Sequence, residues 1–305
     1  MVIDDLDRRI IARLVEDGRV SNKSIAIDLG VSEPTIAVRI RSLIEDGTIR
    51  IVAQRSLHVS KEAGVASLIQ FWLKDLSEAD VIHIALRDVP QIFSLYETTG
   101  SPELVAHCQA GSMAELNRTV AALYARFPQT QITTTPILEL VQYKISFFLP
   151  EVAPARGSPP KNVRDRMIAL LEEDGRQTIR MLSQRLGLAE TSIRQRLRKL
   201  QSSPGFKIGA VTNPFHMGLS IWSDIRICAE SGKVYEVIER LRQSPQVYNV
   251  MHTSGRQNIM VFAVARSIEE MDAFIKGFVR PISAIQNLEA IRVARSLKYN
   301  YSFHM

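Results

Sequence analysis

The 305-residue chain contains little cysteine and no long apolar run. Its two cysteines, Cys108 and Cys228, belong to no CxxC or other metal-ligand spacing, which argues against a disulfide scaffold or structural zinc and favours a reducing compartment. The longest apolar stretch, residues 65–73, is far shorter than the roughly 20 residues of a membrane-spanning helix. Residues 1–20 carry acids and arginines where a secretion signal has an apolar core. We therefore expect a soluble, cytoplasmic protein that does not associate with membranes.

Patterns typical of common catalytic centres are also missing. The sequence has no Ser-His-Asp order, no glycine loop for phosphates and no nucleotide fingerprint. Its histidines are scattered without a metal-type pair: they are His58, His83, His107, His216, His252 and His304. We therefore expect no metal site, no cofactor and no enzymatic activity.

What the sequence does contain is a repeat. Glu16-Asp17-Gly18-Arg19 returns 157 residues later as Glu173-Asp174-Gly175-Arg176, and residues up to Arg41 match those up to Arg198 at the same offset. A stretch with four prolines, residues 150–160, is incompatible with a helix or a central strand. It divides the chain into two copies of one unit.

Each copy opens with three helices. In the first, apolar residues at helical spacing end at Gly18, a second helix begins after Ser21 or Asn22 and ends at Gly30, and a third begins at Ser32 with Pro34 in its first turn. The second copy repeats this pattern, with its middle helix from Thr178 to Gly187. A short alternating segment follows each time and predicts the wing of a winged helix-turn-helix.

After each wing, the periodicity predicts strand, helix, strand, strand, helix, strand. The predicted segments of the first copy are 65–73, a helix from about 78, 92–98, 104–109, 113–127 and 137–143, and those of the second are 221–228, 234–241, 247–252, 259–264, 268–278 and 288–294. This order favours an antiparallel sheet with both helices on one face, a ferredoxin-like fold. The predicted class is α+β, with winged helix-turn-helix domains at 1–55 and 161–212, sheet domains at 56–149 and 213–305, and a linker at 150–160.

Several short segments resemble the leucine-responsive regulatory protein/AsnC family of transcription regulators. They are Leu6-Asp7-Arg8-Arg9-Ile10, Glu16-Asp17-Gly18-Arg19, Leu29-Gly30-Val31-Ser32, Arg39-Ile40-Arg41-Ser42-Leu43 and Asp46-Gly47-Thr48-Ile49. The resemblance occurs once in each copy, and the two copies together cover nearly the whole chain. The chain therefore resembles a tandem fusion of two ordinary members. It implies DNA-binding domains joined to sheet domains that assemble into oligomers and sense amino acids or related small molecules.

The family position of the sensing site lies in the turn between the two middle strands. Members commonly have Gly-Asp there, whereas this chain has Gly-Ser in the first copy and Gly-Arg in the second, which argues against binding of an amino acid in the usual manner. By family position alone, the effector-site candidates are Thr99, Gly100, Ser101 and Glu103 in the first copy and Ser254, Gly255, Arg256 and Asn258 in the second. A plain hairpin turn is the competing interpretation. Arg256 could pair with an acidic ligand, because a guanidinium fork matches a carboxylate.

The two predicted recognition helices differ in chemistry. The candidate DNA-contacting residues are Ser32, Glu33, Thr35, Arg39 and Arg41 in the first, and Glu190, Thr191, Ser192, Arg194, Gln195, Arg198 and Lys199 in the second. Residues 1–55 hold nine Lys and Arg against nine Asp and Glu, whereas residues 160–208 hold eleven against five, a net charge of +6. Because phosphate neutralisation supplies most nonspecific affinity, we expect the second head to bind DNA more strongly.

The sequence thus predicts a sequence-specific transcription regulator that binds double-stranded DNA, responds to an amino acid or organic acid, and forms homo-oligomers. Its two sheet domains could pair within the chain or exchange between chains. A second hypothesis is an enzyme similar to siroheme decarboxylases, in which His107, His252 and Arg256 would serve a tetrapyrrole with several carboxylates. A third is an adaptor in which one head no longer contacts DNA.

Overall fold

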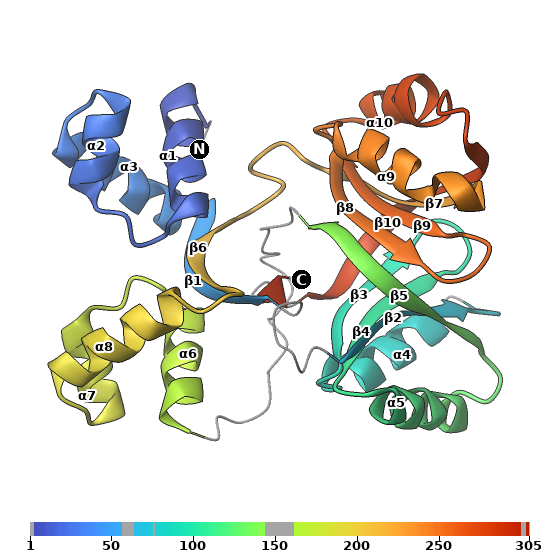
Figure 1. Cartoon of the computed structure of the whole chain (residues 1–305), viewed down its shortest axis with the longest axis horizontal. Helices are drawn as coiled ribbons and strands as arrows, with labels where there is room; N and C mark the ends of the chain where they lie inside the picture. The colour runs from blue at the N-terminus through green and yellow to red at the C-terminus, as the bar shows by residue number, and fades with distance from the viewer. Residues whose placement is uncertain (1–2, 57–63, 76, 144–161, 300–302, 305) are drawn as a thin grey trace.

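The computed structural model describes residues 3–56, 64–75, 77–143, 162–299 and 303–304 (Figure 1). The predicted linker at 150–160 lies outside these residues. The two helix-turn-helix heads lie together on one side of the molecule, and the two sheet domains lie together on the other (Figure 1). None of the helices in the described ranges has the length and apolar character needed to cross a membrane.

The heads have the predicted three-helix pattern. The first consists of α1 (Asp5–Glu16), α2 (Asn22–Leu29), α3 (Glu33–Glu45) and strand β1 (Ile49–Ser56), and the second of α6 (Val163–Glu173), α7 (Ile179–Leu186), α8 (Glu190–Gln201) and strand β6 (Phe206–Thr212). Ser21 caps α2 by accepting the amide of Ser24, and Gly30 ends it in the left-handed conformation at φ 69°. Ser32 caps α3 by accepting the amide of Thr35. These local signals explain why the helix ends could be predicted.

The two wings pair with each other. β1 and β6 run antiparallel from the pair Ile49 and Thr212 to the pair Arg55 and Phe206. One continuous apolar core contains residues of both heads, among them Ile51 and Ile208. The short strand β11 (Phe303–His304) adds to the free edge of β1 in parallel. The heads therefore form one body through a shared sheet and a shared core.

Both sheet domains have the predicted order of strands and helices, and together they close into one barrel. The elements are β2 (Val65–Trp72), α4 (Glu78–Arg87), β3 (Ile92–Thr98), β4 (Leu104–Ala110), α5 (Met113–Arg126) and β5 (Gln131–Tyr143), then β7 (Ile221–Ala229), the short 3-10 turn η1 (Ser231–Lys233), α9 (Val234–Arg242), β8 (Val247–Thr253), β9 (Ile259–Ala265), α10 (Ile268–Phe274), its π-helical extension η2 (Ile275–Val279) and β10 (Ile285–Tyr299). The strand order around the barrel is β10-β3-β4-β2-β5-β8-β9-β7. The sheet domains thus pair within the chain.

The last strand of each domain is longer than the sequence indicated, because it serves two sheets. β5 pairs with β2 through Gln131–Pro136 and then with β8 through Ile137–Tyr143. β10 likewise pairs with β7 and then with β3. Pro136 lies where β5 passes from one partner to the other, and its carbonyl accepts the amide of Ser254. A proline is tolerated at such a transition because the pairing changes there.

Helices cover the outside of the barrel. α4 and α5 pack on the first sheet, and α9 and α10 pack on the second, each over its own apolar core (Figure 1). A third, smaller cluster fills part of the barrel interior and consists of Leu68, Tyr96, Val105, Leu140, Met251 and Met260. The space between the two sheets is therefore only partly filled, and this leaves room for pockets at its ends.

Candidate DNA-binding heads and barrel pockets

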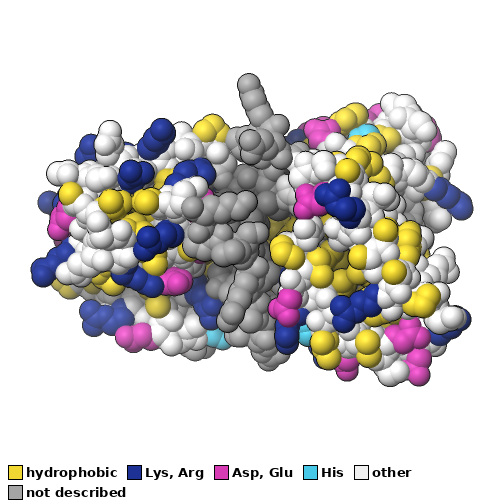
Figure 2. All heavy atoms as spheres, turned by 90° about the horizontal axis from the view of Figure 1, so that it is seen from below, with side chains coloured by type: hydrophobic (Ala, Val, Ile, Leu, Met, Phe, Trp, Pro, Cys, Tyr) yellow, Lys and Arg dark blue, Asp and Glu magenta, His cyan; other side chains and the backbone are white. Residues whose placement is uncertain are grey.

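The second recognition helix, α8, has a polar and cationic outer face. Thr191, Arg194, Gln195, Arg198 and Lys199 are all exposed on it. Two predicted residues of α8 are engaged within the helix, because Glu190 forms an ion pair of 3.5 Å with Arg194 and Ser192 accepts a hydrogen bond from Arg196. On the face seen in Figure 2, Lys and Arg side chains gather on the half of the molecule that holds the heads. The arrangement suits contact with a phosphate backbone and base edges.

The first recognition helix, α3, has a less polar outer face. Where α8 has Arg194, Gln195 and Lys199, α3 has Ala37, Val38 and Ser42, and the Val38 side chain is 62% exposed. Of the residues predicted to contact DNA, Glu33, Thr35 and Arg41 are exposed on α3. Ser32 is also exposed but is occupied as the helix cap.

Arg39 has its guanidinium turned toward its own head. Its Nη1 donates to Asp4 at 2.6 Å and to Asp7 at 3.1 Å, at the start of α1. These carboxylates raise the pKa of Arg39, and Asp7 is fully buried. Arg39 therefore links α3 to α1, and its predicted contact with DNA would compete with these ion pairs.

The repeated Glu-Asp-Gly-Arg segment forms the contact between the heads. Arg176 donates to the carbonyls of Gly18 at 2.8 Å and Val20 at 2.9 Å and to the Asn22 side chain at 3.3 Å. Arg19 donates in return to the carbonyls of Gly175 at 2.6 Å and Gln177 at 3.2 Å. We call this reciprocal contact the arginine clasp.

The glycines of the same segment fit the shared wing sheet. The Gly18 amide donates to Ile208 of β6, and the Gly175 amide donates to Ile51 of β1. A Cβ at Gly18 would lie 2.7 Å from the Ile51 side chain, and one at Gly175 would lie 2.7 Å from the Ile208 side chain. The repeated Glu-Asp-Gly-Arg segment therefore serves the pairing of the two heads. One copy of the segment, taken alone, does not indicate this role.

One of the two predicted effector turns lines a cavity. Ser254, Gly255 and Arg256 border a cavity of about 280 Å³, which we call the polar pocket. Its other lining residues are Leu68, Gln70, Thr135, Arg226, Cys228, Thr253, Gln257, Ile259, Met260 and Asn287. Asn258 instead bonds through its side chain to both backbone groups of Ala229, which fixes the turn.

The turn of the first copy borders neither of the two barrel pockets described here. Thr99 bonds to the carbonyl of Arg292, and the Glu103 carboxylate accepts the amide of Leu73. Gly100 lies against Ile291, and Ser101 is exposed. The structure thus brings one set of predicted effector residues to a cavity and leaves the other set in a hairpin turn.

A buried charge cluster lies behind the polar pocket. Arg226 is 3.0 Å from Asp224 and 4.0 Å from Glu289, and its own side chain is only 3% exposed. The Tyr96 hydroxyl donates to the same Asp224 carboxylate at 3.2 Å. Burial raises the pKa of Asp224, although Arg226 opposes this shift. Among the described residues, the Arg226 Nε has no hydrogen-bond partner.

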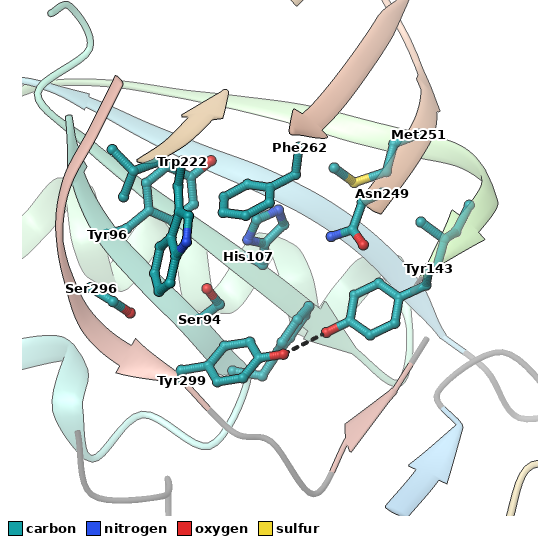
Figure 3. A pocket seen from close by; sticks show the side chains of 13 residues that line it. Ser94, Tyr96, His107, Tyr143, Trp222, Asn249, Met251, Phe262, Ser296 and Tyr299 are labelled. Atoms are coloured by element: carbon teal, nitrogen blue, oxygen red, sulfur yellow. Dashed lines mark hydrogen bonds between the residues drawn. The ribbon is translucent and has the colours of Figure 1, made fainter. Parts of the chain in front are cut away.

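A second pocket, which we call the aromatic pocket, lies between the strands of the barrel (Figure 3). One of its lining residues, Tyr299, also packs against Val52 of β1 and Val211 of β6. Its lining residues are Phe93, Ser94, Tyr96, His107, Leu140, Tyr143, Trp222, Asn249, Met251, Phe262, Val293, Ser296 and Tyr299. The hydroxyls of Tyr143 and Tyr299 are hydrogen-bonded at 3.1 Å across its rim. Burial lowers the pKa of His107 to about 4, so this imidazole is neutral near pH 7.

The sequence did not single out Tyr143 and Tyr299, although a signal was present. The two tyrosines stand 156 residues apart at the ends of β5 and β10, the same spacing that separates the starts of β2 and β7 and close to the 157-residue offset of the heads. The sequence also did not predict Arg226, since its role depends on Asp224 and Glu289 from two different strands.

The three residues considered for tetrapyrrole chemistry do not share a site. His107 lines the aromatic pocket, Arg256 lines the polar pocket, and His252 lies edge-on to Tyr235 of α9 with ring centroids 5.5 Å apart. In the described ranges, no three His, Cys, Asp or Glu side chains are grouped so as to hold a metal ion.

Comparisons with known proteins agree with this architecture. A model of the AsnC-type helix-turn-helix domain matches residues 3–44 and 165–201, and a model of the Lrp/AsnC ligand binding domain matches residues 225–303. The HTH-type transcriptional regulator FL11 of Pyrococcus furiosus is 31% identical over 138 residues, which are 45% of this chain and 89% of that protein. FL11 of Pyrococcus horikoshii is 30% identical over 141 residues, which are 46% of this chain and 93% of that protein.

A solved structure is similar over both copies at once. The siroheme decarboxylase NirDL in complex with an iron-uroporphyrin III analogue has a TM-score of 0.69 and 15% sequence identity, over 97% of this chain and 93% of that one. At that identity, the likeness concerns the fold. It shows that a tandem arrangement of two heads and two sheet domains occurs in another protein.

Proposed function

Because the chain belongs to the Lrp/AsnC family, we propose that it is a sequence-specific transcription regulator that binds double-stranded DNA mainly through its second head. The observation that carries this proposal is the exposed face of α8. Arg194, Gln195, Arg198 and Lys199 stand there on the helix that enters the major groove in helix-turn-helix proteins. Arg and Gln can bond guanine and adenine edges through two atoms, and Lys can neutralise phosphate.

The difference between the heads supports unequal roles in DNA binding. Arg41 of α3 and Arg198 of α8 stand at equivalent positions, 157 residues apart, and both are exposed. Arg198 has Lys199 beside it and Arg194 one turn before it, whereas Arg41 has Ser42 and Ala37 at those places. Loss of one phosphate contact lowers the salt slope of DNA binding by about 0.9.

Selection of binding sites from random DNA with the purified chain, followed by affinity measurement across salt concentrations, tests the proposal. We expect a selected site, and we expect Arg194→Ala with Arg198→Ala to lower the affinity and the salt slope more than Arg39→Ala with Arg41→Ala. Because Arg39 also stabilises α1, the matched comparison is Arg198→Ala against Arg41→Ala. Equal losses in that pair would overturn the asymmetry, and failure to select any site would overturn the function.

We further propose that an amino acid or organic acid binds in the polar pocket and modulates the regulator. Arg226 and Arg256 both line this cavity. Arg226 is already paired with Asp224 and Glu289, so Arg256 is the residue whose guanidinium can bind a ligand carboxylate. Arg256 is exposed at the turn, so it can meet a ligand arriving from solvent.

We propose no enzymatic activity for the chain. Three residues were considered for a tetrapyrrole with several carboxylates, and they form no single site: His107 lines the aromatic pocket, Arg256 lines the polar pocket and His252 packs against Tyr235. An unchanged absorption spectrum of added haem or siroheme is the expected result. We keep homo-oligomer formation as part of the proposal, because the outer helix α4 exposes the apolar side chains of Val81 and Ile84.

A further inference from the structure

We propose that the aromatic pocket is a second ligand site, which binds a small neutral aromatic molecule carrying a hydrogen-bond donor, and that occupation of this site is transmitted to the heads. The first part of this inference depends only on the pocket. The second part rests on the proposed function, since transmission to the heads matters only if they bind DNA.

The lining of the aromatic pocket selects against charge. Among its described lining residues, none is Asp, Glu, Lys or Arg, and six are Phe, Tyr or Trp. His107 is neutral near pH 7 because burial lowers its pKa to about 4. A carboxylate placed there would lose its hydration without gaining a cationic partner, which is costly. The polar pocket, with its two arginines, differs in this respect.

Two buried polar atoms in the pocket have no partner within the described part of the chain. They are the side-chain oxygen Oδ1 of Asn249 and the ring nitrogen Nδ1 of His107. Asn249 is 6% exposed and His107 is 8% exposed, and Figure 3 shows both side chains pointing toward the same space. Buried polar atoms are normally hydrogen-bonded. Two such atoms without a hydrogen-bond partner beside one cavity therefore indicate that a bound molecule supplies the partner. An N–H or O–H on an aromatic ligand would satisfy the acceptor on Asn249.

Entry of such a ligand requires a movement at the rim. The free volume of the aromatic pocket is about 50 Å³. This is room for one or two water molecules, whereas a cavity of about 150 Å³ accommodates benzene. The hydrogen bond between Tyr143 and Tyr299 crosses the rim, and its opening is the simplest way to admit a ring (Figure 3).

Tyr299 connects this rim to the heads. Besides bonding Tyr143, it packs against Val52 of β1 and Val211 of β6, which are fully buried in the sheet shared by the heads. Tyr143 and Tyr299 are also the last described residues of β5 and β10, the strands that join the two halves of the barrel. A ligand that displaces Tyr299 therefore alters the packing beneath both wings at once.

Calorimetric titration of the full chain with indole and benzofuran tests the site. The two probes have nearly the same shape, but only indole has an N–H donor. We expect indole to bind with a dissociation constant on the order of 10–100 µM, within the range open to a ligand of this size. Benzofuran should bind about tenfold more weakly, because it leaves the Asn249 oxygen without a partner. Indole-3-carboxylate, which adds a charge, should not bind in this pocket.

Two variants test whether the heat measured with indole arises from binding in the aromatic pocket. Asn249→Leu should abolish the preference for indole over benzofuran, and Arg256→Ala, which changes only the polar pocket, should preserve it. Equal affinities of the two probes for the unmodified chain, or no heat with either, would overturn the site without reliance on any variant. Retention of the preference in Asn249→Leu would overturn the role of this residue.

Transmission is tested by measuring the DNA affinity of the chain with and without saturating indole. We expect a change of at least about threefold, consistent with ordinary coupling between sites, and expect it to vanish in Tyr299→Ala. Indole binding with an unchanged DNA affinity would overturn transmission and leave the site intact. Indole binding by a chain that selects no DNA would overturn the proposed function instead.

Discussion

Replacement of Arg176 by alanine should weaken the association of the heads more than any exposed arginine replacement does. The guanidinium of Arg176 makes three hydrogen bonds to the opposite head, at distances of 2.8, 2.9 and 3.3 Å. It is about half-buried, and burial lowers the pKa of Arg176, with the nearby charge of Arg19 as a smaller cause. The variant would leave the carbonyls of Gly18 and Val20 without these donors.

The size of the effect follows from these bonds. Hydrogen bonds to a charged group contribute about 1.5–3 kcal/mol each, and partial exposure to water reduces that contribution. We therefore expect a loss of about 3 kcal/mol in the free energy of unfolding of the heads. For a body of roughly 100 residues, this corresponds to a fall in melting temperature of about 10–20 °C.

Calorimetric unfolding of the full chain, with circular dichroism in urea as a second measure, provides the assay. The matched control is Arg185→Ala, because Arg185 pairs with Glu173 at 2.9 Å within one head and both side chains are exposed. That pair should contribute less than about 1 kcal/mol. A fall in melting temperature for Arg176→Ala no larger than for Arg185→Ala would refute the clasp as a stabilising contact between the heads.

Two further predictions concern the barrel. Calorimetry with amino acids and organic acids should detect binding that Arg256→Ala weakens about tenfold or more, as loss of a charge-assisted contact does; no binding, or undiminished binding by the variant, would remove the effector role. Burial lowers the pKa of His107 from its usual 6.5 to about 4. As the pH falls, the imidazole is therefore protonated in the unfolded chain before it is protonated in the folded chain. The free energy of unfolding should consequently decline as the pH falls from 6.5 to 4. His107→Leu should reduce that decline by at most about 3 kcal/mol in urea titrations, and a decline as steep as that of the unmodified chain would contradict the assignment.

The elements that the sequence predicted well are those specified by local chemistry. Ser21, Gly30 and Ser32 mark helix ends through hydrogen bonds and a left-handed turn that involve only neighbouring residues. The alternating apolar residues of the sheet domains specified a buried face in the same way. The fold class and the order of elements could therefore be predicted from one copy of the repeat.

The features that escaped prediction depend on the other half of the molecule. The strand predicted at 137–143 is only the second part of β5, which begins at Gln131 and exchanges β2 for β8 as its partner after Pro136. Arg19 and Arg176 resembled part of a DNA-binding motif, yet their hydrogen bonds cross between the heads. The aromatic pocket combines side chains from both copies, so neither copy alone indicates it.

The shared sheet of β1 and β6 has a consequence for how the protein would lie on DNA. A homodimer carries every substitution twice, so its two recognition helices stay identical and it reads a palindrome. Here each head belongs to the same chain, and a substitution changes one of them only. Under the proposed function, the preferred DNA site consists of two different half-sites, and the protein binds it in a single orientation. A promoter could then be distinguished from its reverse by a single bound molecule.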